Sequence, residues 1–286
     1  MNPRPPRGFS DSRDSRGYRA EGTLSSMRLA SWNINGLRAR FDYARRWLEE
    51  RRPDIVAWQE LKLQDDQFPG NELAELGFEC AVHGQKAWNG VAVLSRFPLE
   101  VVQVGLPGEE ELGARLIGVR TGGLFVFSAY IPNGKEVGHP DFPRKLRWLD
   151  RLLEYMAETF QPTDPVVLAG DFNLCPAALD SWNEEELAGT IFHTGDERRR
   201  FQAFLEWGFH DLFRVMHPDV QAFSWWDYRA GAFPQNRGLR IDLVLGTAPV
   251  RARLAAAGID RDWRKKKDGL TPSDHAPVWV ELCDER

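Results

Sequence analysis

The chain has 286 residues, of which 42% are hydrophobic and 28% charged, and its formal net charge at pH 7 is −5. This composition excludes a wholly disordered chain, and the lack of any run of about 18 apolar residues excludes a membrane-spanning helix. Three widely separated cysteines, Cys80, Cys175 and Cys283, exclude a disulfide framework and a Cys-x-x-Cys metal site. Because the N-terminal region also lacks the apolar stretch of a secretory signal, we expect a cytoplasmic protein.

Residues 1–26 form a segment rich in Arg, Pro and Ser with almost no apolar side chains. Such a segment buries too little surface to offset chain entropy, so we predict a disordered tail. The tail is either an arm that binds nucleic acid or an extension upstream of a start at Met27. Over residues 27–286 no linker or solenoid repeat interrupts the pattern, which predicts one folded domain.

Short apolar, β-branched and aromatic runs predict strands along most of this domain. The predicted strands span residues 28–32, 54–58, 91–94, 115–120, 124–130, 165–168, 241–245 and 277–282. Helical spacing predicts helices over residues 37–51, 143–160 and 197–207. Helices and strands do not alternate strictly as they do in a barrel. We therefore predict an α+β fold in which two sheets pack face to face and helices lie outside.

Polar side chains follow the last apolar residues of several predicted strands, where loops commonly display functional groups. If these strand ends share one edge, a single pocket collects Asn33, Glu60, Tyr130, Asp171, Asn173, Asp242, Asp274 and His275. Four carboxylates in one pocket repel one another, and a hard divalent ion such as Mg²⁺ or Mn²⁺ relieves that repulsion.

Each of these residues also has a purely structural interpretation. An Asp or Asn after a strand is commonly a turn former or a helix cap, and Tyr130 and His275 fit ordinary core positions. Asp242 is harder to explain in this way, because a charge between Ile241 and Leu243 needs a buried partner. The set as a whole favours a catalytic site.

Eight motifs, in order between Ser31 and Val280, resemble those of the exonuclease III family of apurinic/apyrimidinic endonucleases. They are SWNINGLRAR (31–40), WQELK (58–62), HGQK (83–86), YIPNG (130–134), GDFN (170–173), FSWWDYR (223–229), NRGLRID (236–242) and PSDHAPV (272–278). The resemblance implies a four-layered α/β sandwich of two mixed sheets, like that of deoxyribonuclease I, over residues 27–286. It also implies a metal-dependent DNA repair nuclease that cleaves 5′ of abasic sites, removes 3′ blocking groups and degrades duplex DNA from the 3′ end.

The resemblance assigns the metal and the attacking water to different residues. It places the metal on Glu60, with Asn35 and Asp274 nearby. Asp171 corresponds to the base that accepts a proton from the attacking water, and Asn173 would orient that water. Phosphodiester hydrolysis needs both functions, since the nucleophile must be activated and the phosphate charge neutralised.

The remaining pocket residues are implied to contact the phosphate. His275 would donate a hydrogen bond to a phosphate oxygen, and Asp242 would hold its imidazole in one tautomer. Tyr130 and Asn33 would also touch the phosphate. The resemblance leaves open whether Tyr130 or Asp171 accepts the proton.

An abasic nucleotide is cheaper to extrude from a duplex than a normal one, because it neither stacks nor pairs. The resemblance implies an apolar slot for its sugar at Trp225, Leu239 and Ile241, three residues that would otherwise be ordinary core. Candidate contacts to the DNA backbone are Arg38, Lys62, Lys86, Asn133 and Arg229. We expect a monomer that acts on double-stranded DNA with abasic sites or damaged 3′ ends.

His193 departs from this pattern in a segment that the family places near the slot. Its bulky side chain is predicted to narrow the slot and shift preference from abasic cleavage toward trimming of 3′ ends.

Two other functions are compatible with some of the same residues. One is a phosphatase or esterase of the same superfamily on a non-DNA substrate, and the other is a catalytically inactive DNA-binding scaffold.

Overall fold

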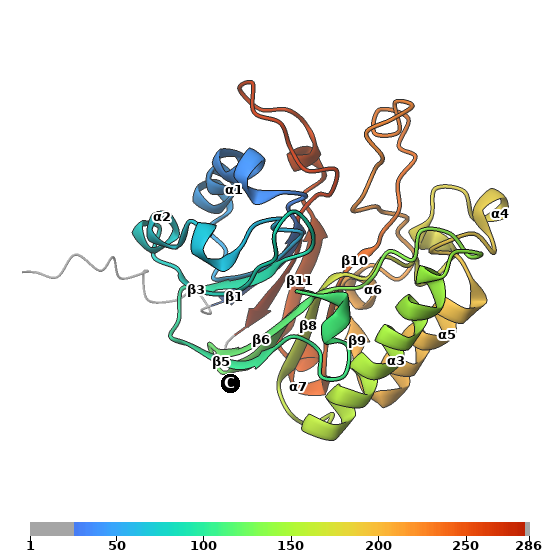
Figure 1. Ribbon diagram of the computed structural model, residues 1–286, viewed down its shortest axis with the longest axis horizontal. Coiled ribbons are helices and arrows are strands. Elements are labelled where there is room, and N and C mark those ends of the chain that lie inside the picture. Colours follow the sequence, from blue (N-terminus) through green and yellow to red (C-terminus); the bar gives the residue numbers. More distant parts are fainter. Residues whose placement is uncertain (1–25, 284–286) are drawn as a thin grey trace, which may run out of the picture.

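Two six-stranded mixed sheets lie face to face, with helices on their outer sides (Figure 1). The computed structural model describes residues 26–283. The predicted tail therefore lies outside the described residues except for Ser26, which already belongs to the first strand. Within the described range, no helix has the length and apolar character needed to cross a membrane.

The first sheet has the order β11-β12-β1-β2-β4-β3. Its central strands β1 and β2 are parallel, and Asn33 is opposite Gln59, so both strands end at the same edge of the sheet. The bounds are β1 Ser26–Asn33, β2 Ile55–Gln59, β3 Glu79–His83, β4 Val91–Ser95, β11 Leu254–Ile259 and β12 Val278–Cys283.

The second sheet has the order β5-β6-β7-β8-β10-β9. Tyr130 pairs with Asp171 between parallel strands β7 and β8, and Asp171 pairs with Asp242 between antiparallel strands β8 and β10. Three candidate residues thus lie in one row at the end of this sheet. The bounds are β5 Leu99–Val104, β6 Leu116–Thr121, β7 Leu124–Tyr130, β8 Val166–Asp171, β9 His210–Asp211 and β10 Asp242–Gly246.

Alternation along the strands divides the apolar side chains between three layers of core. On β7, Val126 faces the other sheet, whereas Phe127 faces α3 and α5. On β1, Leu29 faces the other sheet and Trp32 packs beneath α1. The helices are α1 Leu37–Arg51, α2 Gly70–Glu75, α3 Asp141–Thr159, α4 Glu184–Leu187, α5 Gly195–Trp207, α6 Leu212–Met216 and α7 Ala248–Ala252.

The predicted sandwich of two sheets flanked by helices is confirmed. Each predicted strand and helix is present, with ends shifted by a few residues. The sequence prediction missed β3, β5, β9 and β11: β5 is largely exposed and bulged, β9 has two residues, and β11 is rich in alanine. The predicted position of Asp242 inside a strand was wrong. Asp242 is the first residue of β10 and not an interior one, which sets its carboxylate at the end of the sheet.

Candidate active site

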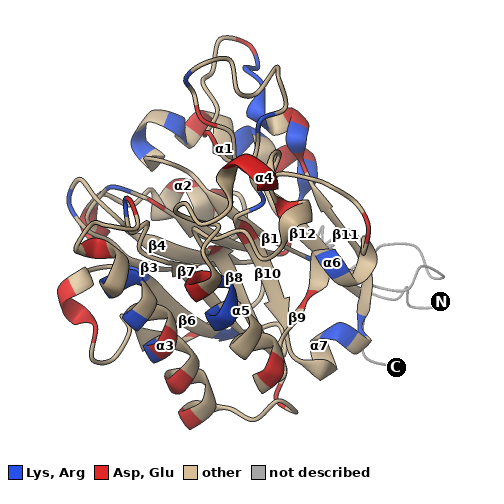
Figure 2. Cartoon of the chain, turned by 90° about the vertical axis from the view of Figure 1, so that its right-hand side faces the viewer, with Lys and Arg blue, Asp and Glu red and all other residues tan. Residues whose placement is uncertain are grey.

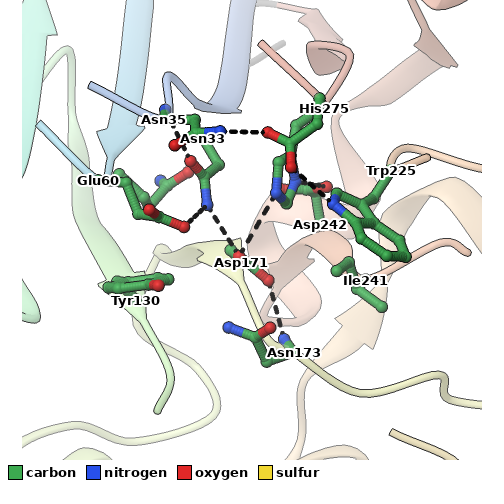
Figure 3. Close-up of polar contacts among 12 residues, drawn as sticks. Asn33, Asn35, Glu60, Tyr130, Asp171, Asn173, Trp225, Ile241, Asp242 and His275 are labelled. Carbon is green, nitrogen blue, oxygen red and sulfur yellow. Dashed lines mark hydrogen bonds and ion pairs between the residues drawn. The ribbon is translucent and has the colours of Figure 1, made fainter. Parts of the chain in front are cut away.

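Side chains from both sheets converge where the strands end (Figure 3). Asn33, the last residue of β1, donates from Nδ2 to Glu60 Oε1 at 2.9 Å and to Asp171 Oδ2 at 2.9 Å. Glu60 follows β2 in the first sheet, and Asp171 ends β8 in the second. One buried amide thus bridges two carboxylates on different sheets, so the site exists only when the sheets are packed.

His275 lies between two carboxylates. Its Nδ1 is 2.8 Å from Asp242 Oδ2, and its Nε2 is 3.9 Å from Asp171 Oδ2. Burial alone would lower the pKa of His275, but the charge and hydrogen bond of Asp242 raise it to about 10. The imidazole is therefore protonated at neutral pH, donates through Nδ1 to Asp242, and has its Nε2 proton on the side of Asp171.

Asp171 is buried beside these groups, and its pKa is raised, whereas pairing with a cation lowers the pKa of a surface carboxylate. Burial, with smaller contributions from the charges of Asp242 and Glu60, raises the pKa to about 7 against the opposing effects of His275 and Asn33. Its Oδ1 accepts a hydrogen bond of 2.9 Å from the backbone N–H of Asn173. A carboxyl group with a pKa near the operating pH is well suited to act as a general base.

The amide side chain of Asn173 is held from two directions. Its Nδ2 donates to the carbonyl of Ile131 at 2.9 Å, and its Oδ1 accepts from Asn133 Nδ2 at 3.2 Å. The backbone of Asn173 is left-handed, with φ of 49°. Asn133, expected to contact the DNA backbone, therefore belongs to the hydrogen-bond network of the site.

Tyr130 stacks under the Arg115 guanidinium, whose centre is 4.7 Å from the ring centroid. Burial, with the negative charges of Glu60 and Asp171, raises the pKa of Tyr130 well above 10, while Arg115 opposes the shift. The phenol is therefore protonated at neutral pH. Of the two candidate proton acceptors, Asp171 has the pKa that suits the task.

Two of the three predicted metal ligands contact a lysine ammonium, and the third is hydrogen-bonded to one of them. Lys62 Nζ is 2.8 Å from Glu60 Oε2 and 2.6 Å from Asn35 Oδ1, and Asn35 Nδ2 donates to Asp274 Oδ1 at 2.8 Å. Lys62 pairs with two of the candidate ligands in this structure, and its contact to the DNA backbone stays a prediction. Glu60, Asn35 and Lys62 all have left-handed backbone, a strain that is common at functional sites.

Oxygen donors around a partly exposed positive charge fit a hard divalent cation. Burial would raise the pKa of Glu60, but Lys62 holds it below its ordinary value. Burial likewise opposes ionisation of Asp274, but the charge of His275 and a hydrogen bond from Trp225 Nε1 lower its pKa. Both carboxylates are charged at neutral pH.

A second set of potential ligand atoms includes two buried residues. One atom each from Glu60, Asp171 and His275 lie within 4.8 Å of one another. This set shares only Glu60 with the predicted one, because the sequence did not indicate how closely Asp171 approaches it. The imidazolium of His275 has to lose its proton before it can bind a cation, which favours the oxygen ligands.

The three predicted slot residues do come together. Leu239 and Ile241 are buried in one apolar cluster with Cys175, and the half-buried Trp225 packs against it. Trp225 and Leu239 exchange two backbone hydrogen bonds of 2.9 Å. Phe192 also packs against this cluster, and sequence reasoning missed it although it precedes His193.

His193 is buried, and both ring nitrogens are engaged. Nε2 lies 2.9 Å from Ser181 Oγ and Nδ1 lies 3.1 Å from the carbonyl of Ile191. These bonds fix the ring next to residue 181, while the neighbouring Phe192 packs on the slot cluster. The effect of His193 on the slot stays a prediction.

The other candidate DNA contacts lie on the surface. Arg38 donates to Gln67 Oε1 at 3.1 Å, Lys86 is exposed, and Arg229 pairs with Asp227 at 2.8 Å. Figure 2 shows Lys and Arg interspersed with Asp and Glu along α3 and acidic residues on α4. The structure brings none of these three cations into the buried cluster.

Two packed sheets with carboxylates, amides and an imidazolium at one end define a phosphoester hydrolase architecture. The chain belongs to the Endonuclease/Exonuclease/phosphatase family, whose profile matches residues 30–275. That range contains all the residues of the site described above.

Relatives with stated activities cover nearly the whole chain. An exodeoxyribonuclease III from Haemophilus influenzae is 34% identical over 269 residues, covering 90% of this chain and 100% of the relative. A 3′ phosphatase from Neisseria, solved with a product DNA hairpin, has a TM-score of 0.85 and 35% identity, covering 90% and 99%. An AP endonuclease from Archaeoglobus fulgidus has a TM-score of 0.85 and 32% identity, covering 91% and 100%.

Proposed function

We propose that this protein is a DNA repair nuclease that hydrolyses the phosphodiester 5′ of abasic sites and removes blocking groups from 3′ ends, with 3′→5′ exonuclease activity. The observation that carries the proposal is the buried Asp171, whose pKa is about 7, beside the imidazolium of His275. A base and a proton donor on one side of a pocket suit attack by water on a phosphate. The relatives' stated activities support DNA as the substrate.

In this proposal each side chain handles a defined proton or charge. Asp171 accepts the proton of the attacking water, and the Asn173 amide orients that water. The Nε2 proton of His275 binds a non-bridging phosphate oxygen as its charge grows. Asp242 accepts from Nδ1, and its negative charge stabilises the imidazolium so that Nε2 keeps its proton.

Glu60, Asp274 and Asn35 would hold the divalent ion, which we propose to be Mg²⁺ with Mn²⁺ as a substitute. When bound, the ion neutralises charge on the phosphate. In this structure the Lys62 ammonium pairs with Glu60 and Asn35, and it would have to move away from them for an ion to bind there. We further propose that the enzyme is a monomer in the cytoplasm, where it associates with the nucleoid by binding DNA.

Substrate choice would depend on the slot lined by Trp225, Leu239 and Ile241. An extruded abasic sugar fits an apolar slot that excludes a base by size. Because Phe192 packs against this cluster and the adjacent His193 is buried next to Ser181, we expect trimming of 3′ ends to exceed abasic incision. The similarity to a Neisseria 3′ phosphatase supports the expectation of faster action at 3′ ends.

The test uses three labelled duplexes: one with an internal abasic site, one with a 3′ phosphate and one with a plain recessed 3′ end. We expect cleavage of all three with Mg²⁺, fastest on the 3′ phosphate, and none with EDTA. Binding without cleavage would identify an inactive scaffold. Hydrolysis of phosphoinositides without any action on DNA would identify a phosphatase of the same superfamily.

A further inference from the structure

A buried ion pair lies directly behind the candidate catalytic loops. Lys145 on α3 pairs through Nζ with Glu197 Oε1 on α5, and neither side chain has any exposed surface. Removing two charges from water is costly, and further hydrogen bonds are needed to compensate it. The partners of these two side chains are therefore informative.

Lys145 directs its other two protons to the loops that follow β7 and β8. Nζ donates to the backbone carbonyl of Asn173 and, at 3.3 Å, to that of Asn133. With Glu197 as the third acceptor, every proton of the ammonium has a partner. The same nitrogen lies 4.8 Å from the centroid of the Phe192 ring.

Glu197 holds the segment that leads into α5. Its Oε1 accepts from the backbone N–H of Phe192 at 3.1 Å, and its Oε2 accepts from the N–H and hydroxyl of Thr194 at 3.0 and 2.7 Å. The first of these residues packs against the slot. The ion pair thus connects three loops: residues 131–134, 173–175 and 191–194.

The hydrogen bond from Lys145 to Asn173 connects the ion pair to the candidate general base, Asp171. The N–H of Asn173 binds Asp171 Oδ1, while its carbonyl points to Lys145, so the ammonium anchors one end of the residue whose other end holds the base. The left-handed φ of 49° at Asn173 is a conformation that asparagine adopts more readily than most residues, and it accompanies these two opposed hydrogen bonds.

We propose that Lys145 and Glu197 are positioning residues that set the Asn173 amide beside Asp171 and fix the slot wall at Phe192. Neither residue touches the substrate. The proposal rests on the proposed nuclease function, since it concerns the geometry of that reaction. Displacing a water-orienting amide by about 1 Å is enough to slow a reaction by about 10²-fold.

The chain offers a matched control on the same two helices. Arg200 on α5 pairs with Asp150 on α3 at 2.8 Å, with partly exposed side chains, and also bonds the carbonyls of Leu146 and Asp196. These contacts stay on α3 and α5. Arg200→Met therefore removes an ion pair between the helices while leaving the loops untouched.

The experiment compares Lys145→Met, the double variant Lys145→Met/Glu197→Gln and Arg200→Met with wild type. Lys145→Met leaves the Glu197 charge buried alone and is expected to lower Tm, whereas the double variant removes that charge and recovers most of the loss. Its single-turnover rate is nevertheless expected to stay about 10- to 10²-fold below wild type, because the carbonyl of Asn173 has no anchor. DNA affinity is expected to change by less than about threefold, since neither Lys145 nor Glu197 touches the substrate.

Hydrogen exchange supplies a readout that does not depend on activity. Amides of residues 173–175 and 192–194 are expected to exchange at least about tenfold faster in the double variant, and at the wild-type rate in Arg200→Met. Recovery of the rate together with Tm would reduce the pair to a stabilising role and overturn the proposal, as would unchanged exchange in these segments. A wild-type protein that cuts no DNA would refute the nuclease function, and the exchange result would still decide whether the pair holds the loops.

Discussion

Two buried charged clusters lie side by side at the start of β10, and their charge balance differs. Arg240, two residues before Asp242, is fully paired with Asp180 at 2.6 Å and with Asp211 at 2.7 Å, and Arg214 adds a second bond to Asp180 at 2.6 Å. We call these four residues the arginine cluster. The second cluster, at the candidate active site, consists of Glu60, Lys62, Asp171, Asp242, Asp274 and His275.

The arginine cluster contains two cations and two carboxylates, whereas the active-site cluster contains two cations and four carboxylates. With the nearby guanidinium of Arg115 counted as well, carboxylates still outnumber cations at the active site. In the balanced cluster the charges neutralise one another, and its role is to hold the loop at Asp180 against β10. Burial, together with the charges of Asp242 and Glu60, raises the pKa of Asp171 to about 7, and the excess of carboxylates suits a metal ion. Incomplete compensation of buried charge therefore distinguishes the functional cluster from the structural one.

The largest expected effect comes from unbalancing the arginine cluster. Arg240→Met leaves the carboxylate of Asp211 buried without its guanidinium and is expected to lower the free energy of unfolding by about 3–5 kcal/mol. Urea denaturation measures the loss. Arg214→Met, at a partly exposed position, is the control and is expected to cost less. A loss below about 1 kcal/mol for Arg240→Met would contradict the view that this cluster is a structural one.

Neutralising the active-site cluster is expected to impair catalysis while the fold persists. Asp171→Asn removes the base and His275→Ala removes the proton donor, so each is expected to lower the single-turnover rate at least about 10²-fold. Quench-flow or gel assays of the abasic and 3′-phosphate duplexes measure the rates. Near-wild-type rates in either variant would refute the assigned role.

The same substitution at Asp171 is expected to stabilise the metal-free protein. A pKa of about 7 in the folded state, against about 3.9 when unfolded, means that the folded protein loses stability as pH rises from about 4 to 7. Asp171→Asn removes that cost, but part of the gain in stability is offset because the hydrogen bond from Asn33 to the carboxylate is lost. We expect an increase of about 1–3 kcal/mol at pH 8 in EDTA, which disappears near pH 4. A destabilised variant at pH 8 would show that Asp171 is not under electrostatic strain.

The smallest expected effect concerns substrate choice. His193→Gly removes the ring that is held by Ser181 and is expected to raise abasic incision by about tenfold relative to 3′-phosphate removal, as expected for opening an apolar slot. The ratio of the two rates measured in one preparation checks this. Unchanged abasic cleavage would discard the role of His193 and direct attention to Phe192.

The sequence predicted the fold and most of the site because both depend on local signals. Apolar runs marked the buried strands, and polar residues at their ends marked the edge where Asn33, Asp171 and His275 meet. The pairing of Lys62 with Glu60 could not be predicted, because it depends on left-handed backbone at both residues. Lys145 is an ordinary charged residue in the sequence pattern, and only the packing of α3 on α5 shows that it is buried.

The most direct test of the central claim is the pH dependence of single-turnover cleavage with saturating Mg²⁺, in wild type and in Asp171→Asn. If Asp171 is the base, the wild-type rate rises about tenfold per pH unit below the pKa of this carboxyl and then levels off. The residual rate of the variant then lacks this rise. An Asp171→Asn enzyme that keeps the same rising limb would show that another group accepts the proton.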